Sequence, residues 1–214
     1  MEKSEFLKIL ILTVRRCVKN RYKYHRLDKS RLGEAEVRNV MAKILEEKKT
    51  YYGIEVSTRE RFQKQVKQTT RRALIDLAIY DGPDAELPSI IVEFKRSQPV
   101  LYNIIKDFKK MMAEPNNIKG ACFFHILPQS EGAKQGKASM GRISRARNEI
   151  IKKYNEAHKE AKVRRCVDKW FILFILDGSK DEYYYVEKVS ICCLDGLGTG
   201  EWNVLKSRQR KDEF

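Results

Sequence analysis

Apolar residues recur every three or four positions in parts of the chain, which is the spacing of an amphipathic helix. Phe6, Leu10 and Val14 follow this spacing near the start of the sequence. Ser30 stands before a second segment of this kind, where its hydroxyl would serve as the N-cap. The pattern predicts helices over residues 4–20, 32–48, 101–112 and 143–162.

Short, nearly continuous apolar runs lie between these segments and are typical of buried strands. Two of them flank the turn signal Asp81-Gly82-Pro83, so they are expected to form a hairpin. The polar and basic segment "RERFQKQVKQTTRR" is expected to be a loop or an irregular strand facing solvent. The expected strands are "YYGIEV", "ALIDLAIY", "SIIVEFK", "ACFFHIL" and "WFILFIL", with a strand pair in "YYYVEKVSICCL".

Helices and strands are interspersed along the chain, with one hairpin near the middle. This order predicts an α/β fold with a mixed central β-sheet flanked by helices. The sequence contains no internal repeat and no long Pro/Gly/Ser linker, so residues 1–214 are expected to form a single domain. Its parts are an N-terminal helical extension at 1–30, a core at 32–126, and a basic loop, helix and C-terminal strands at 127–214.

The charge balance is strongly positive, with 44 Lys and Arg residues against 29 Asp and Glu and a net charge of +15. Such a balance favours a polyanionic partner, of which nucleic acid is the commonest and an anionic membrane surface the second. The third interpretation of this charge is a basic soluble protein without such a partner.

Other compositional features favour a cytoplasmic protein with no membrane partner. The apolar run "ILILTV" is too short to span a bilayer, and no small-residue cleavage site follows it. The five cysteines form no Cys-x-x-Cys pair, which favours buried thiols in a reducing compartment over a structural metal site.

One strand of the hairpin carries charged residues among its apolar ones. Glu93 and Lys95 point to one side of a strand of period two, while Val92 and Phe94 point to the other. A carboxylate and an ammonium on an otherwise apolar strand are costly unless they have a partner or a purpose. The strand therefore belongs either to a structural hairpin with a surface ion pair or to a functional site.

Two aspartates compete for the place opposite Glu93. If the strands pair about a turn near residues 84 and 85, Asp76 lies directly opposite Glu93, with the Cβ atoms about 5 Å apart. Asp84 instead falls at the turn, roughly 30 Å of strand away from Glu93. The spacing therefore selects Asp76.

Two opposed carboxylates raise each other's pKa, and a hard divalent cation relieves their repulsion. Mg²⁺ suits such a site because it prefers oxygen ligands and commonly binds through one or two carboxylates together with phosphate oxygens. Lys95 is placed to hold a scissile phosphate or to orient a metal-bound water. Burial would lower its pKa and the carboxylates would raise it, a balance that the sequence leaves open. These residue types together indicate metal-assisted hydrolysis of a phosphodiester.

The segments "ALIDLAI" and "IIVEFK" resemble the PD-(D/E)xK nuclease superfamily, which includes restriction endonucleases and archaeal Holliday-junction resolvases. The resemblance covers the order helix, strand, Asp strand, Glu-x-Lys strand, helix, strand in the core at 32–126. It implies a restriction-endonuclease-like core (αβββαβ) and endonucleolytic cleavage of DNA with Mg²⁺ or Mn²⁺. The sequence departs from the family pattern at Ile75, where a proline usually precedes the aspartate. The implied site residues are the metal ligands Asp76 and Glu93, the main-chain carbonyl of Phe94 as a further ligand, and Lys95 for the attacking water.

Many members of this superfamily also use a glutamate from the first core helix. Glu34 falls near the apolar stripe that contains Val37 and Met41, whereas Glu36 points well away from it. Helical phase therefore selects Glu34 as a candidate catalytic residue. Its alternative role is that of a first-turn acidic residue favoured by the helix dipole, and both readings stay open.

Basic residues that would hold the substrate gather in a segment that leads into the Asp76 strand and in a later Gly-rich segment. Phosphate contacts need clustered cations rather than a fixed spacing, so solvated charged faces are the alternative reading. The expected partner is DNA, with RNA not distinguished from it, and paired cutting sites would suit a homodimer. The rivals are a non-catalytic nucleic-acid-binding module with the same fold and a membrane-surface protein that uses its N-terminal helix. The candidate nucleic-acid-binding residues are Arg59, Arg61, Lys64, Lys67, Arg71, Arg72, Lys134, Lys137, Arg142 and Arg145.

Overall fold

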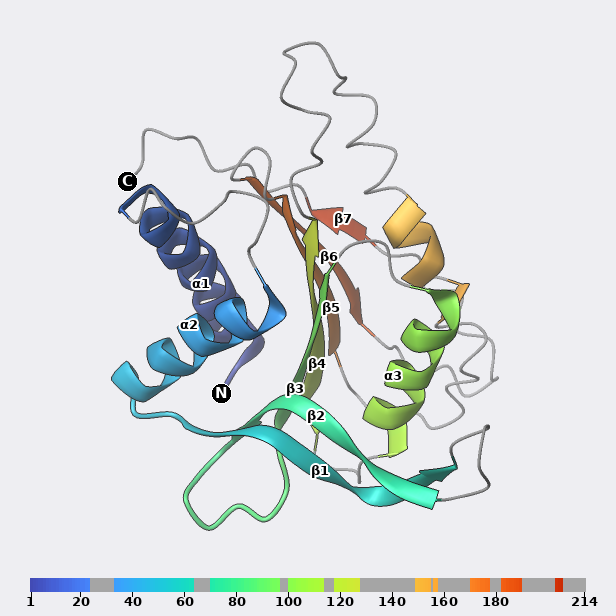
Figure 1. Ribbon diagram of the computed structural model, residues 1–214. Coiled ribbons are helices and arrows are strands. Elements are labelled where there is room, and N and C mark those ends of the chain that lie inside the picture. Colours follow the sequence, from blue (N-terminus) through green and yellow to red (C-terminus); the bar gives the residue numbers. More distant parts are fainter. Residues whose placement is uncertain are drawn as a thin grey trace.

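The fold is a mixed β-sheet with helices on both faces (Figure 1). Seven strands in the described part of the chain lie in this sheet, in the same order as along the chain. The strands are β1 (Tyr51–Gln63), β2 (Thr70–Tyr80), β3 (Ile90–Arg96), β4 (Gly120–Leu127), β5 (Trp170–Asp177), β6 (Glu182–Val189) and β7 (Asn203–Leu205). The computed structural model describes residues 1–23, 33–63, 70–96, 100–113, 118–127, 149–154, 156–157, 170–177, 182–189 and 203–205.

Strand direction changes across the sheet. The three central strands, β3, β4 and β5, run parallel to one another, and the strands on either side of them pair antiparallel. The α/β fold with a mixed central sheet, predicted from the order of the elements, is confirmed.

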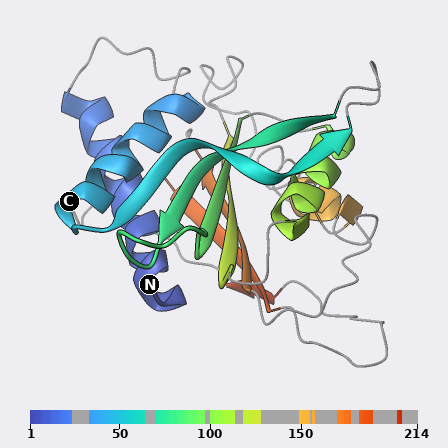
Figure 2. The same cartoon turned by 90° about the horizontal axis from the view of Figure 1, so that it is seen from below.

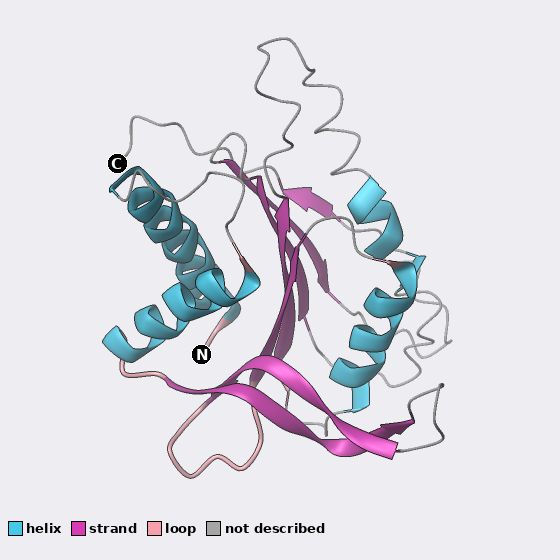
Figure 3. Ribbon diagram, viewed as in Figure 1, coloured by secondary structure: helices cyan, strands magenta, loops and turns pink. Residues whose placement is uncertain are grey.

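Two layers of helices cover the sheet (Figure 3). α1 (Lys3–Lys23) and α2 (Glu34–Glu47) lie on one face, and α3 (Leu101–Ala113) lies on the other. These three helices confirm the predicted helical segments to within a few residues at each end. Of the basic helix expected at 143–162, residues 149–154 and 156–157 are helical, and the rest lie outside the described residues.

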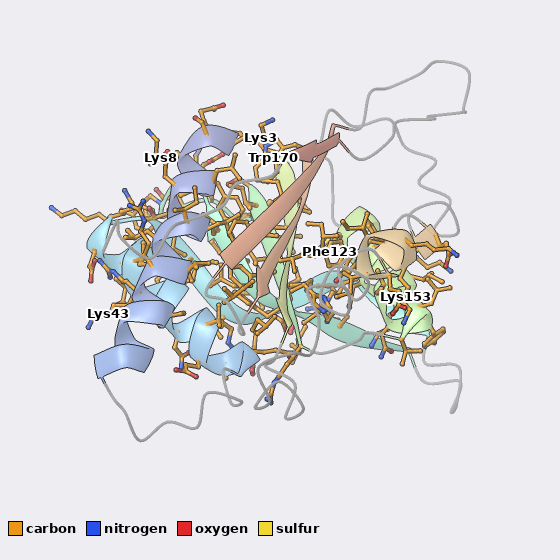
Figure 4. All side chains as sticks on the ribbon, turned by 90° about the horizontal axis from the view of Figure 1, so that it is seen from above. Lys3, Lys8, Lys43, Phe123, Lys153 and Trp170 are labelled. Carbon is orange, nitrogen blue, oxygen red and sulfur yellow. The ribbon has the colours of Figure 1, made fainter. Side chains whose placement is uncertain are left out.

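The sheet separates two hydrophobic clusters, as the positions of Trp170 and Phe123 in Figure 4 illustrate. Phe6 of α1 packs against Trp170 of β5 with ring centroids 5.5 Å apart. On the opposite face, Phe108 of α3 and Phe123 of β4 lie 4.7 Å apart. The apolar face of α1 is thus buried against the sheet, which argues against its use as a membrane-binding surface. Among the described helices, none has the apolar length needed to cross a bilayer.

β1 and β2 extend beyond their contact with β3 as a two-stranded ribbon. β2 pairs with β3 between Leu77 and Ile79, but it pairs with β1 as far as Thr70, which stands opposite Gln63. Figure 2 shows the ribbon crossing from the α1–α2 layer toward α3. Residues 59–63 and 70–72 of "RERFQKQVKQTTRR" lie in the ribbon strands, so the prediction of a loop is wrong there. Main-chain pairing does not require apolar side chains. The register shift between Ser57 and Arg61 fits the alternative of an irregular strand.

Two other boundaries differ from expectation. α2 has Gly33 at its N-cap, in an extended conformation and without a side-chain cap, so the helix begins after the expected cap Ser30, which lies outside the described residues. Of the strand pair expected in "YYYVEKVSICCL", the first strand is β6, which pairs with β5 and with β7, and residues 190–194 lie outside the described residues. β7 pairs through the main chain over three residues, too few to give a detectable sequence pattern.

Candidate active site

The β2–β3 hairpin places Asp76 beside Glu93. The observed pairs include Leu77 with Val92 and Ile79 with Ile90, and one further step along the same register sets Asp76 opposite Glu93. Asp76 Oδ2 accepts a hydrogen bond from the main-chain N–H of Phe94 at 2.8 Å. The carboxylate therefore takes the place of a main-chain acceptor where the ladder ends. The register is the one that strand spacing predicts.

The two faces of β3 are separated as the period of two predicts. Val92 and Phe94 lie in the hydrophobic cluster on the α1–α2 side, while Glu93 and Lys95 make ion pairs with α3 on the other side. The N–H and C=O of a strand residue point toward the same neighbouring strand. The Phe94 carbonyl is therefore expected to face the same gap as its N–H, beside Asp76.

Glu93 and Lys95 are enclosed by two charged residues of α3. Glu93 is 1% exposed, and its Oε2 lies 3.7 Å from Lys95 Nζ. Lys95 Nζ is closer to Asp107 Oδ2, at 2.8 Å. Lys110 Nζ lies 2.6 Å from Glu93 Oε1 and 3.4 Å from Asp107 Oδ1. The hairpin residues thus belong to a buried network rather than to a surface ion pair.

Asp107 and Lys110 were not identified from the sequence. They lie three residues apart on α3, whose apolar residues Ile104, Phe108 and Met111 are buried. Asp107 stands three positions after Ile104, so helical phase alone places it on the buried side of the helix. A charged residue among buried apolar positions is the signal that could have identified Asp107, just as it identified Glu93.

Burial determines the charge state of Glu93 in competition with its neighbours. Burial raises the pKa of Glu93 to about 8 in the metal-free protein, and the carboxylates of Asp76 and Asp107 act in the same direction. The ammonium groups of Lys110 and Lys95 act in the opposite direction. The short contact with Lys110 favours the ionised carboxylate, so the proton and the ammonium compete for the same group.

Lys95 remains charged in spite of its burial. Burial lowers the pKa of Lys95, but Asp107, Glu93 and Asp76 more than offset this effect, so that the pKa lies above its ordinary value. The balance that the sequence left open is thus decided by the carboxylates. A charged ammonium donates hydrogen bonds and cannot accept a proton.

Glu34 lies at the same end of β3 as the network. It is the first residue of α2, and it is exposed to solvent. Its carboxylate nevertheless interacts with the charges of Lys95 and Asp76. Partial burial raises the pKa of Glu34, Asp76 adds to this increase, and Lys95 together with a main-chain hydrogen bond from Arg96 opposes it. Helical phase therefore selected the glutamate of α2 that lies near the hairpin site.

The donor set fits a hard divalent cation. The carboxylates of Glu34, Asp76, Glu93 and Asp107 outnumber the ammonium groups of Lys95 and Lys110. Although an ammonium lies nearby, the buried Glu93 Oε1 has no well-aligned hydrogen bond among the described residues. Within those residues, no three His, Cys, Asp or Glu side chains converge on one point. A metal here would take two carboxylates and complete its shell with other oxygens, as Mg²⁺ commonly does.

The other candidate residues are exposed, or their side chains cannot be placed. Asp84 is exposed in the connection between β2 and β3, consistent with the choice of Asp76. The core residue His125 stands in register with Lys95, and its Nδ1 lies 3.4 Å from the hydroxyl of Tyr154. Arg72 is exposed on β2. The ribbon strands contain Arg59, Arg61 and Arg71; the residues outside the described part are Lys64, Lys67, Lys134, Lys137, Arg142 and Arg145.

No protein-family model, curated protein or solved structure matches this chain. The function is therefore inferred from the chemistry of the residues that the hairpin, α2 and α3 bring together.

Proposed function

We propose that this protein is a metal-dependent endonuclease of the PD-(D/E)xK type that hydrolyses phosphodiester bonds in DNA. The observation that carries the proposal is the register of the hairpin, which sets Asp76 beside Glu93 with Lys95 on the same face of β3. Glu34 of α2 lies close enough to share their electrostatic environment. Acidic oxygens beside a charged lysine suit the binding of a metal and a phosphate together.

The order of elements supports the same proposal. α2, β1, β2, β3, α3 and β4 follow one another as helix, three strands, helix and strand, which corresponds to the αβββαβ core that the sequence resemblance implies. In this proposal α1 and β5–β7 extend the core on either side.

Each residue of the site has a role that follows from its environment. Asp76, Glu93 and the Phe94 carbonyl would hold Mg²⁺ or Mn²⁺, which when bound supplies Lewis-acid activation of the phosphate and of water. Lys95, held in its charged form by the carboxylates, would donate hydrogen bonds to the phosphate or to the attacking water rather than accept a proton. Glu34 lies at the more exposed edge, where it would orient a water molecule.

The β1–β2 ribbon is the proposed contact with the nucleic acid. Its basic residues lead directly into the Asp76 strand, and Arg61 stands in register with Arg72. Phosphate contacts need clustered cations rather than a fixed spacing, and the ribbon strands contain several arginines. The net charge of +15 supports the same class of partner. DNA is the proposed substrate, with RNA as the alternative, and a homodimer would supply paired sites.

A second candidate, a non-catalytic nucleic-acid-binding module, is favoured by one observation. Glu93 and Lys95 already have ion-pair partners on α3, as expected if the network only joins the helix to the sheet. The two candidates differ in their response to metal, because a module that only binds is indifferent to EDTA.

Cleavage of supercoiled plasmid tests the proposal. Wild type, Asp76→Ala and Lys95→Ala would be incubated with Mg²⁺, with Mn²⁺ and with EDTA. The proposal predicts nicking by wild type with either metal, none with EDTA, and a loss of about 100-fold or more in both variants. Plasmid binding without metal-dependent cleavage, repeated on single-stranded and branched DNA and on RNA, would instead support the binding module.

A further inference from the structure

The cation nearest to Glu93 comes from α3 rather than from the Glu-x-Lys strand. Lys110 Nζ lies 2.6 Å from Glu93 Oε1, whereas Lys95 Nζ lies 3.7 Å from Glu93 Oε2. The side chain of Lys110 is 5% exposed, so its charge is screened little by water. A buried ammonium at this distance is the main electrostatic partner of the carboxylate.

Lys110 also contacts the strand that carries Asp76. Its Nζ donates a hydrogen bond to the main-chain carbonyl of Leu74 on β2 at 2.8 Å. The same atom therefore touches β2, β3 and, through Asp107 Oδ1 at 3.4 Å, its own helix. This ammonium has oxygen neighbours from both strands of the hairpin, and one of them, the Glu93 carboxylate, is a ligand that the proposed metal would also use.

The contact between Lys110 and Glu93 is close but poorly directed. Glu93 Oε1 has no well-aligned hydrogen bond in the described part of the chain, although the ammonium is within ion-pair distance. If Glu93 were released, Lys110 would keep Asp107 and the Leu74 carbonyl as partners. The ammonium can therefore give up Glu93 to another cation and still have oxygen partners. It would not become an unpaired buried charge, which would be costly.

We infer that Lys110 is an internal cation that pairs with Glu93 in the metal-free protein and competes with the divalent metal for this carboxylate. The inference rests on the proposed function, because it assumes that Glu93 is a metal ligand. Metal binding then proceeds by exchange: the cation takes Glu93, and Lys110 stays paired with Asp107. Lys110 is a positioning residue in this account, and it sets the metal concentration at which the site fills.

Calorimetric titration with Mg²⁺ tests the inference. Lys110→Met removes the ammonium but keeps an unbranched side chain of similar length. Lys109→Met is the matched control, because it removes one positive charge from an exposed position of the same helix. The inference predicts Mg²⁺ binding about tenfold or more tighter in Lys110→Met than in wild type, and little change in Lys109→Met.

The possible results separate this inference from the proposed function. Mg²⁺ binding by wild type that is lost in Asp76→Ala but not tightened in a folded Lys110→Met would overturn the inference alone. Absence of Mg²⁺ binding in wild type and in Lys110→Met would overturn both. Mg²⁺ binding by Lys110→Met but not by wild type would support the inference, because Lys110 would then keep the metal out of the wild-type site.

A second measurement serves if Lys110→Met does not fold. A crystal structure of wild type with Mn²⁺ is predicted to show the Lys110–Glu93 contact lengthened beyond ion-pair distance, with the Lys110–Asp107 contact kept. Retention of the 2.6 Å contact with Mn²⁺ bound at Asp76, or no Mn²⁺ at the hairpin, would overturn the inference.

Discussion

Asp76 accepts a hydrogen bond from the main-chain N–H of Phe94 at 2.8 Å, so that a side chain of β2 replaces a main-chain acceptor where the ladder with β3 ends. The Phe94 carbonyl is expected to face the same gap as its N–H, beside Asp76. The hairpin would thereby provide carboxylate and carbonyl oxygens on adjacent strands, without a dedicated binding loop.

Asp107→Asn is predicted to destabilise the protein, because it removes the charged partner of Lys95 at 2.8 Å. The expected loss is about 2–3 kcal/mol in the free energy of unfolding, since one member of a largely buried pair is removed. Urea denaturation would measure it. Asp84→Asn in the exposed connection is the control, and it should change stability by no more than about 0.5 kcal/mol. An equal effect of both substitutions would contradict the account of the network.

The stability of the metal-free protein is predicted to fall as the pH rises from about 5 to about 8. The folded protein keeps the Glu93 proton up to a pKa of about 8, whereas the unfolded chain releases it near 4.5. The stabilisation from protonated Glu93 is therefore complete below pH 4.5 and is lost as the pH rises through 8. Thermal unfolding in EDTA across this range would show it. Glu93→Gln cannot titrate and should flatten the profile, and a profile that keeps its slope in this variant would refute the assignment.

Glu34→Gln decides between the two roles left open for this residue. A catalytic role predicts a fall in cleavage rate of about 10- to 100-fold with little change in melting temperature. A helix-dipole role predicts a small loss of stability, about 0.5 kcal/mol, and unchanged cleavage. Glu36→Gln is the matched control, because it lies in the same first turn and should show only the dipole effect. Equal cleavage by the two variants would exclude Glu34 from the site.

Arg72→Gln tests the ribbon as a phosphate-binding surface. Arg72 is exposed on β2 and stands in register with Arg61 of β1. Loss of one phosphate contact should weaken DNA binding and lower the slope of log affinity against log salt by about 1. Lys43→Gln on α2, an exposed position in the helix layer on the opposite face of the sheet from α3 (Figure 4), should leave the slope unchanged. An equal change in both variants would point to general charge rather than to the ribbon.

The parts of the site that were predictable depend on local geometry. Strand alternation separates Glu93 from Phe94, the hairpin register follows from the turn, and helical phase distinguishes Glu34 from Glu36. Each of these relations is fixed within one element or between two strands joined by a short connection. A period of 2.0 or 3.6 residues is enough to derive them.

The partners of Glu93 and Lys95 were not predicted, because they depend on how α3 packs on the sheet. Lys110 of the helix layer contacts Glu93 of the sheet. The position of this contact is set by how α3 crosses β3 and not by any spacing in the sequence. The ribbon was predicted only as the irregular-strand alternative to a loop, since its strands are joined by main-chain pairs such as Phe62 with Arg71 and carry no apolar alternation there. Interactions between layers and between main chains leave little periodic signal.

Two aspartates of the same hairpin separate the proposed site from the exposed connection. Asp76→Asn and Asp84→Asn change one carboxylate each, at the proposed site and in the exposed connection, and plasmid nicking with Mg²⁺ would be measured for both at matched DNA binding. If Asp76 holds the metal, nicking falls by about 100-fold or more in Asp76→Asn and stays at the wild-type level in Asp84→Asn. Metal-dependent nicking that survives in a folded Asp76→Asn would place the chemistry elsewhere and contradict the account.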